Sequence, residues 1–410
     1  GQYVDSIQSM MKRVFAHAAD RGMGICFAFD ADMTLTFVQE DFIRQMPPAG
    51  KFMVQKGKTG VPNPDTAEGQ AYYTAQSKGL ITAYPMLTQI GCWVRGSSWF
   101  SEIQPQELPA DWQKDLSQLT ATHSVLKATK PGEMARAYLV AKIVEAYEKA
   151  LKELGRADIE VVTGSWDAKW FVPTAILLPH TKLMPIDWDV RNNRSLIENP
   201  QTLADFEKYA PGRVIPFIWT HHDDGQYIGR CYKPADKLSS KLKQAGAAGV
   251  GVFHWLNRPE DLYFKNVERQ TWAGSVDEDC RITCDTMALD YFGDKSLGSY
   301  LFEWVNDAPI FGRATAVNMY VRSMNECRFT NQQRADGAKR LAFLKSVDRK
   351  KMSAGQAGRL EYFQTLEQFI LEFIDTQHQM NLAEQHIKEG NISLAREALA
   401  KGNPERAVRI

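Results

Sequence analysis

The chain has 410 residues, enough for two or three domains with a substantial core. Lysine plus arginine equals aspartate plus glutamate at 49 each, so the formal net charge is zero and the basic surplus typical of a nucleic-acid binder is missing. No apolar stretch reaches the roughly 18 residues that a membrane span requires.

The compartment and the oligomeric state stay open. The first residues, GQYVDSIQSM, lack the basic and apolar regions of a signal peptide. If such a peptide has been removed, a periplasmic or extracellular location is favoured. The cysteines do not decide the question, because Cys26 and Cys92 fall in predicted core strands, and Cys280 and Cys284 are too few for a zinc site.

Helix and strand patterns alternate along the chain up to Trp272. Apolar runs of about 4–8 residues predict strands buried on both faces, at Ile25–Phe29, Ile90–Val94, Ile159–Gly164, Leu183–Ile186, Val214–Trp219 and Val250–Phe253. Helical periodicity separates them, at Val4–Arg21, Thr66–Ala83, Glu133–Leu154, Ala235–Ala245 and Glu260–Trp272. The alternation predicts an α/β fold with a parallel sheet, either open or closed into a barrel.

Six strands are two short of a (β/α)8 barrel. Residues 1–21 resemble a covering helix, and such a helix normally follows a strand. We therefore expect a (β/α)8-type barrel over residues 1–275, with its N-terminal strands outside this chain; an intact six-stranded open sheet is the alternative. Residues 276–410 show only helical patterns, which predict an all-helical domain packed on the barrel, with helices at Arg340–Val347, Gly358–His378 and Met380–Glu389. The segment Pro47–Pro64 is expected to be a loop at the rim.

Carboxylates follow the predicted strands at their carboxyl ends, where ligands of parallel sheets gather. Close carboxylates raise one another's pKa, so that one donates a proton while another acts as base or nucleophile, as glycoside hydrolysis requires. Asp187 and Asp189 bracket Trp188 and would point the same way on a strand. Each carboxylate alone could instead be a helix cap or a salt-bridge partner. The candidates are Asp30, Asp167, Asp187, Asp189 and Asp223.

Aromatic and basic residues share the same strand ends. Indole rings stack on sugars, although each tryptophan singly could fill the core. The guanidinium of arginine binds carboxylates in a bidentate manner, which favours a uronic acid, although each arginine could instead neutralise a nearby aspartate. The candidates for substrate binding are Arg95, Arg191, Arg258, Trp166, Trp188, Trp255, His221, His222 and His254.

Two other functions fit part of this pattern. A metal-dependent barrel hydrolase of amide or ester bonds could use His221, His222, Asp223, Asp224 and His254. However, neighbouring residues on a strand point to opposite sides, and the spacings H-x-H and H-E-x-x-H are missing. A non-catalytic carbohydrate-binding barrel would keep the tryptophans without an acid. Glycoside hydrolysis itself needs no cofactor and no metal.

The segments VIPFIWTHHDDGQYIGRCYKPADKL and AGAAGVGVFHWLNRPEDLYF, followed by DYFGD and WVNDAPIFGR, resemble TIM-barrel glycoside hydrolases with a helical C-terminal domain. The similarity covers roughly residues 150–315 and is nearest to the α-glucuronidase type, with hexosaminidase-type barrels behind it. It implies that the visible strands are the third to eighth of the barrel. It also implies water-activating carboxylates at Asp187 or Asp189 and at Asp223.

In that family an acid follows the fourth strand, but here Arg95 stands at this position. Asp30 or Asp167 is therefore expected to donate the proton, with Asp187 or Asp189 as base or nucleophile. The sequence thus predicts hydrolysis of a glycosidic bond in a polysaccharide or oligosaccharide that carries an acidic sugar.

Overall fold

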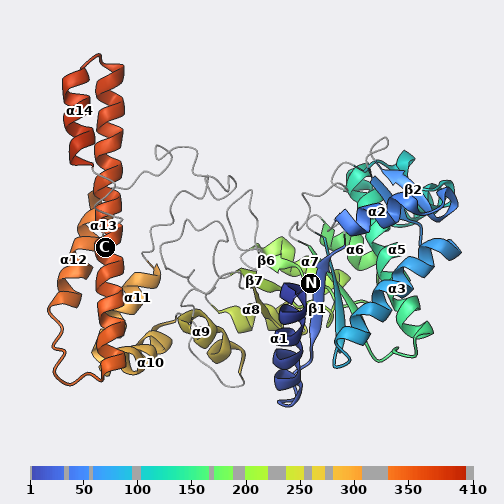
Figure 1. The fold of residues 1–410 in the computed structure, drawn as a ribbon, viewed down its shortest axis with the longest axis horizontal. Helices are drawn as coiled ribbons and strands as arrows, with labels where there is room; N and C mark the ends of the chain where they lie inside the picture. Colours follow the sequence, from blue (N-terminus) through green and yellow to red (C-terminus); the bar gives the residue numbers. More distant parts are fainter. Residues whose placement is uncertain are drawn as a thin grey trace. The chain divides into compact units, whose positions relative to one another are not determined.

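The computed structural model describes residues 2–31, 37–54, 59–94, 103–165, 170–187, 199–219, 237–253, 261–272, 280–306 and 331–402 (Figure 1). The chain divides into two compact units, which are described in turn. The first comprises Gly1–Ile218 with Lys241–Gly251, and the second comprises Trp219–Ser240 with Val252–Ile410.

All six predicted strands are present. They are β1 (Cys26–Asp30), β4 (Gln89–Val94), β5 (Glu160–Ser165), β6 (Ile186–Asp187), β7 (Phe217–Trp219) and β8 (Gly251–Phe253). One sheet has the order β1-β4-β5 with parallel pairing, and another has the order β6-β7-β8, in which β6 and β7 are parallel. Leu183 forms parallel bridges with Thr163 on one side and with Val214 on the other, and so connects the two sheets.

Through these pairings the strands lie side by side in chain order. A doubly wound sheet reverses its strand order at a switch point, whereas a (β/α)8 barrel keeps the order of the chain. The order within the described residues has no such reversal. A complete eight-stranded barrel remains a prediction.

The helices of the strand-containing part of the chain form largely where periodicity predicted them. The predicted ones are α1 (Gln2–Ala19), α3 (Ala67–Ala83), α5 (Pro131–Glu153) and α8 (Leu238–Gln244). The Thr66 hydroxyl accepts a hydrogen bond from the Gly69 backbone N–H at 3.1 Å and so starts α3. Four further helices of 13 residues or fewer were not predicted: α2 (Phe37–Gln45), α4 (Ala110–Thr122), α6 (Phe171–Leu177) and α7 (Pro200–Tyr209).

The segment Pro47–Pro64, expected as a loop, contains a β-hairpin, and that expectation was wrong. Strands β2 (Lys51–Val54) and β3 (Thr59–Pro62) pair antiparallel. The Phe52 ring meets the Trp112 ring edge-on with centroids 5.3 Å apart, and Val61 is only 2% exposed. The hairpin is thus held by packing against residues distant in the sequence, which local sequence patterns do not reveal.

Helices cover one face of the sheet β1-β4-β5. On this face Phe27 stacks on Tyr84 with ring centroids 5.6 Å apart, and Phe29 meets Tyr147 at 5.4 Å. Helix α5 contacts β4 and β5, and 14 of its 23 residues are buried. Because successive strand residues alternate between faces, Ala28 and Asp30 belong to the opposite face. That face matters for the candidate site.

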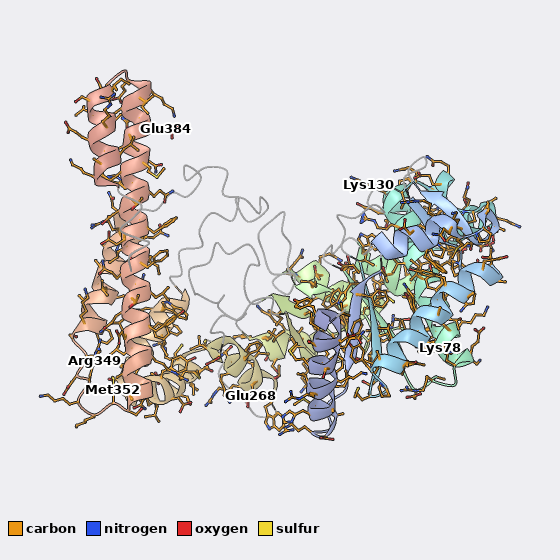
Figure 2. All side chains as sticks on the ribbon, viewed as in Figure 1. Lys78, Lys130, Glu268, Arg349, Met352 and Glu384 are labelled. Carbon is orange, nitrogen blue, oxygen red and sulfur yellow. The ribbon has the colours of Figure 1, made fainter. Side chains whose placement is uncertain are left out.

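From Asp261 onwards every described element is a helix or a 3-10 turn. The helices are α9 (Asp261–Thr271), α10 (Arg281–Phe292), α11 (Gly298–Asn306), α12 (Asn331–Lys345), α13 (Ala354–Lys388) and α14 (Ile392–Lys401). The separate helices predicted at Gly358–His378 and Met380–Glu389 form one helix, α13, because no glycine or proline interrupts the sequence between them. Glu384 lies near the far end of this helix (Figure 2), and Lys388 pairs with it at 2.8 Å.

The described helices of this part have an aromatic core that includes a buried ion pair. The ring of Phe363 on α13 meets those of Tyr300 and Trp304 on α11 with centroids 5.8 and 5.3 Å apart. One turn further along α13, the buried Glu367 accepts a hydrogen bond from Arg340 Nε at 3.2 Å and one from the Tyr300 hydroxyl at 3.3 Å. The pair ties α12 to α13, because a buried charge without its partner is costly.

Candidate functional site

Two of the predicted catalytic carboxylates end strands. Asp30 is the last residue of β1 and lies opposite Trp93, and Asp187 is the last residue of β6 and lies opposite Ile218. Strands β1 and β6 belong to sheets with parallel pairing that Leu183 connects. Both aspartates therefore stand at carboxyl ends of strands, where parallel α/β folds bind ligands.

Asp30 belongs to the sheet face opposite the one on which Phe27 and Phe29 pack against Tyr84 and Tyr147. It is in register with Trp93 on β4, and Trp93 is in turn in register with Gly164 on β5. The Trp93 ring meets the Phe217 ring edge-on with centroids 5.8 Å apart. Asp30 thus lies on the same sheet face as Trp93, whose ring packs against that of Phe217.

Glycines make room for these rings. A Cβ atom on Gly164 would lie 2.6 Å from the Trp93 ring, and one on Gly251 would lie 2.7 Å from the Phe217 ring. Both contacts are closer than packed carbon atoms allow. Trp93 therefore packs on the sheet, and the residue is half-buried.

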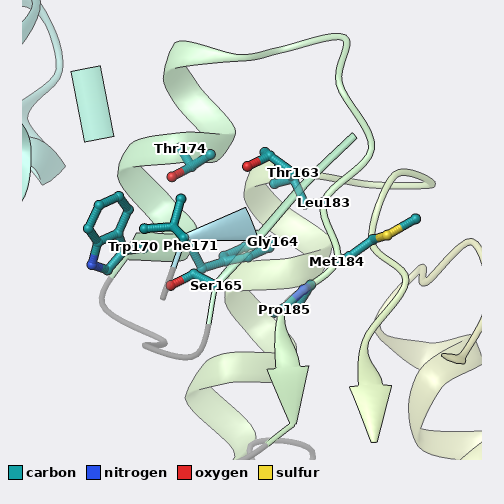
Figure 3. Close-up of a pocket in the computed structure, with 10 residues that line it drawn as sticks. Thr163, Gly164, Ser165, Trp170, Phe171, Thr174, Leu183, Met184 and Pro185 are labelled. Carbon is teal, nitrogen blue, oxygen red and sulfur yellow. The ribbon is translucent and has the colours of Figure 1, made fainter. Parts of the chain in front are cut away.

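A small pocket lies beside the end of β5 (Figure 3). Ser165, which lines this pocket, is the last residue of β5. Trp170 and Phe171, at the start of α6, and Met184 also line the pocket. Its volume of about 20 Å³ holds about one water molecule. The lining is mostly apolar, so this pocket by itself does not accommodate a sugar ring.

The buried Trp170 has a structural role at this place. The Arg136 guanidinium lies 4.4 Å from the centre of its ring, which is cation–π geometry. Arg136 comes from α5 and is only 5% exposed. The contact joins α5 to the residue that directly precedes α6.

Polar and charged groups at the amino ends of the strands, opposite the candidate site, pair with one another. Glu160, at the start of β5, accepts hydrogen bonds from Gln89 at 2.8 Å and from Lys182 at 2.9 Å. Burial, together with the charge of Glu160, raises the pKa of the Cys26 thiol to about 11. Cys26 was expected to be core; its thiol is largely buried, but the residue as a whole is exposed at the start of β1. These groups stabilise the amino ends of the strands.

The remaining predicted site residues lie outside the part of the chain that the structure describes, and their roles stay predictions. They are Arg95, Trp166, Asp167, Trp188, Asp189, Arg191, His221, His222, Asp223, His254, Trp255 and Arg258. Within the described ranges, no group of three or more histidine, cysteine, aspartate or glutamate residues could hold a metal ion. None of the helices described has the length and apolar character needed to cross a membrane.

Sequence reasoning missed a polar cluster on the helices. Asp65, in the turn before α3, accepts a hydrogen bond from the Trp112 indole N–H at 2.6 Å and pairs with Lys142 at 3.2 Å. Tyr138, Lys142 and Glu145 lie on one face of α5, at spacings of four and three residues. This spacing is a visible signal, but the partners on other elements are not.

No protein-family model and no curated protein matches the chain. A GH138 enzyme targeting pectin rhamnogalacturonan II is similar in structure, with a TM-score of 0.51 and 13% identity, over 96% of this chain and 52% of that enzyme. CpGH84B is similar with a TM-score of 0.48 and 12% identity, over 98% of this chain and 63% of that protein. The chain thus spans about half to two thirds of their lengths.

The similarity to the GH138 enzyme concerns the fold. The chain has a loosely glycoside-hydrolase-like fold, in which small parallel sheets are combined with many helices. At this identity the similarity does not extend to particular site residues.

Proposed function

We propose that this chain belongs to a glycoside hydrolase that cleaves a polysaccharide or oligosaccharide containing an acidic sugar. The observation that carries the proposal is the strand arrangement: parallel strands follow one another in chain order, and Asp30 and Asp187 stand at their carboxyl ends. The glycoside-hydrolase-like fold supports it.

The proposed chemistry uses two carboxylates. One, Asp30 or Asp167, protonates the oxygen of the leaving group, and the other, Asp187 or Asp189, acts as base or nucleophile. Asp223 is a further candidate for activating water. The half-buried position of Asp30 beside Trp93 is compatible with a proton donor at the edge of a sugar-binding surface.

Recognition of the acidic sugar is assigned to residues after the strands. Arg95, Arg191 and Arg258 would hold the carboxylate of the sugar, because a guanidinium binds a carboxylate through two parallel hydrogen bonds. Trp166, Trp188 and Trp255 would stack on sugar rings, and His221, His222 and His254 would bond to hydroxyl groups. In this respect the enzyme would be of the α-glucuronidase type.

A substrate panel tests the proposal. Oligosaccharides with and without uronic acids, including pectin fragments, are incubated with the protein, and released sugars are measured. Asp30→Asn, Asp187→Asn and Asp189→Asn are compared with Asp20→Asn, a control at an exposed position just after α1. A catalytic carboxylate is expected to contribute about 10²- to 10⁴-fold to the rate.

Three outcomes count against the proposal. Activity on amide or ester substrates that is lost when metal ions are chelated would indicate a metal-dependent hydrolase. Sugar binding without turnover, unchanged by all three variants, would indicate a carbohydrate-binding barrel. Equal activity of the control and the three variants would remove these aspartates from the mechanism.

A further inference from the structure

A second cavity lies away from the strand ends, between the helices α4, α5 and α6. Its volume of about 390 Å³ falls within the range of small-ligand pockets, which is about 300–1,000 Å³. None of its lining residues belongs to the pocket at the end of β5. A ligand in this cavity would therefore occupy a site separate from the proposed catalytic one.

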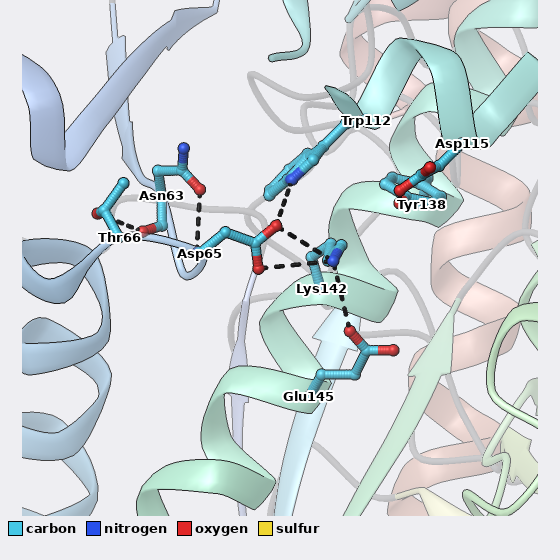
Figure 4. Close-up of polar contacts among 8 residues, drawn as sticks. All are labelled: Asn63, Asp65, Thr66, Trp112, Asp115, Tyr138, Lys142 and Glu145. Atoms are coloured by element: carbon cyan, nitrogen blue, oxygen red, sulfur yellow. Dashed lines mark hydrogen bonds and ion pairs between the residues drawn. The ribbon is translucent and has the colours of Figure 1, made fainter. Parts of the chain in front are cut away.

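Two carboxylates from different helices line this cavity. Asp115 on α4 accepts a hydrogen bond from the Tyr138 hydroxyl at 3.0 Å, and Glu145 lies two turns further along α5 than Tyr138 (Figure 4). Asp115 forms no ion pair with any residue that the structure describes. Among the described residues, the Tyr138 hydroxyl is a hydrogen-bond donor to this carboxylate but carries no compensating charge.

The cation in the lining is already engaged by a third carboxylate. Lys142 Nζ lies 3.2 Å from Asp65 Oδ2 and 3.9 Å from Glu145 Oε2 (Figure 4). It also lies 5.6 Å from the centre of the Trp112 ring, within cation–π range. Lys142 is thus shared between two acids, and the group of Asp65, Asp115, Lys142 and Glu145 carries an excess of negative charge.

Two of these groups have a raised pKa. Burial raises the pKa of the Glu145 carboxyl group, Lys142 opposes the rise, and the charge of Asp65 adds a smaller increase. Burial raises the pKa of the Tyr138 hydroxyl, and its hydrogen bond to Asp115 raises it further. A positive charge in the cavity would lower the pKa of both groups, because it stabilises their ionised forms.

The rest of the lining is mixed, because Gln118 and Thr122 are polar and the other residues are apolar. Leu119 from α4, Ala141 from α5, and Ile176 and Leu177 from α6 contribute hydrocarbon surface. A bare metal ion would gain nothing from this surface, whereas an alkyl chain would gain about 25 cal/mol for each Å² removed from water. The combination of acids with an apolar wall is therefore suited to a ligand that carries both a cation and a hydrocarbon part.

We infer that this cavity binds an aliphatic amine, whose ammonium group is held by Asp115 and Glu145 and whose hydrocarbon chain lies against Leu119, Ile176 and Leu177. The inference does not depend on the proposed glycoside hydrolase activity. It assigns a ligand class to a site on the helices that cover the sheet.

Isothermal titration calorimetry tests this site. The five-carbon diamine cadaverine is titrated into the full chain, and pentane-1,5-diol, which has the same chain length without charge, serves as the ligand control. Saturable binding of cadaverine is expected, with an affinity that falls as ionic strength rises. Binding of the diol with the same affinity, or no binding of the diamine, would overturn the inference.

Variants locate the binding. Asp115→Asn and Glu145→Gln are each expected to weaken binding by about two- to fivefold, and the double variant by about tenfold. Glu153→Gln, at an exposed position near the end of α5 and outside the cavity, is the matched control and should bind as the unaltered chain does. Circular dichroism confirms that each variant is folded. Unchanged affinity in the folded double variant would place the amine elsewhere and refute the site.

Discussion

Replacing Gly164 by alanine tests the packing of the sheet below the candidate site. The new Cβ would lie 2.1 Å from the Met184 carbonyl oxygen and 2.6 Å from the Trp93 ring. The oxygen belongs to backbone and cannot rotate away. The segment that carries it is also fixed to β5, because Met184 N–H donates to Thr163 at 2.7 Å and Thr163 N–H donates to Lys182 at 3.2 Å.

The expected loss of stability follows from these contacts. Overpacking a core costs about 1–3 kcal/mol. Moving the backbone near Met184 would weaken at least one of the two hydrogen bonds, at about 0.5–1.5 kcal/mol. Because the two costs add, Gly164→Ala should lower the free energy of unfolding by about 1.5–4.5 kcal/mol.

Gly79→Ala is the matched control. Gly79 lies inside α3 at an exposed position, and no atom lies within 4 Å of the added Cβ. Alanine is preferred over glycine in a helix by about 1 kcal/mol, so this variant should be slightly more stable. Urea unfolding followed by circular dichroism and tryptophan fluorescence measures both variants. A Gly164→Ala variant within about 0.5 kcal/mol of the unaltered chain would refute the packing described here.

Three further predictions concern charged and titratable groups. Because the pKa of the Cys26 thiol is about 11, its alkylation rate should rise about tenfold per pH unit up to that value, as measured by mass spectrometry. Glu160→Gln should lower this pKa. A plateau of the alkylation rate below about pH 9 would contradict the prediction. The raised pKa of Glu145 means that the folded chain binds this proton more tightly than the unfolded chain does. Stability is therefore lost as pH rises from about 4.5 through the raised pKa, and Glu145→Gln should be more stable above that window in unfolding experiments; equal pH profiles would contradict it. Arg340→Met removes the guanidinium that pairs with the buried Glu367, and it should lower the free energy of unfolding by about 3–5 kcal/mol in thermal and chemical unfolding. The double variant Arg340→Met with Glu367→Leu should recover most of this stability. Unchanged stability of the single variant would show that the pair is not formed.

Strands and long helices could be predicted from the sequence, because both leave a local pattern. The apolar run Ile90–Val94 became β4 with its central residues buried, and the run Val4–Arg21 became α1 within two residues at each end. Short elements were missed. Helix α6 has only seven residues with a proline among them, so its periodicity is too brief to stand out.

The candidate site was predicted in part. The position of Asp30 and Asp187 at strand ends follows from where the apolar runs stop. The environment of Asp30 does not follow, because register with Trp93 and the place of Phe217 on the same face depend on which strands are neighbours. The acidic cavity was not predicted at all, since its residues come from three helices that are separated in the sequence.

The sequence by itself determined the alternation of helix and strand and the residues that end each strand, because burial of apolar side chains imposes a local period on each element. Tertiary structure decided the order of the strands, the hairpin β2–β3, and the contact of Asp65 with Lys142 across 77 residues of chain. Such contacts depend on which surfaces meet once the chain has folded. No local period records them, because the free energy they contribute arises only when distant side chains are brought together.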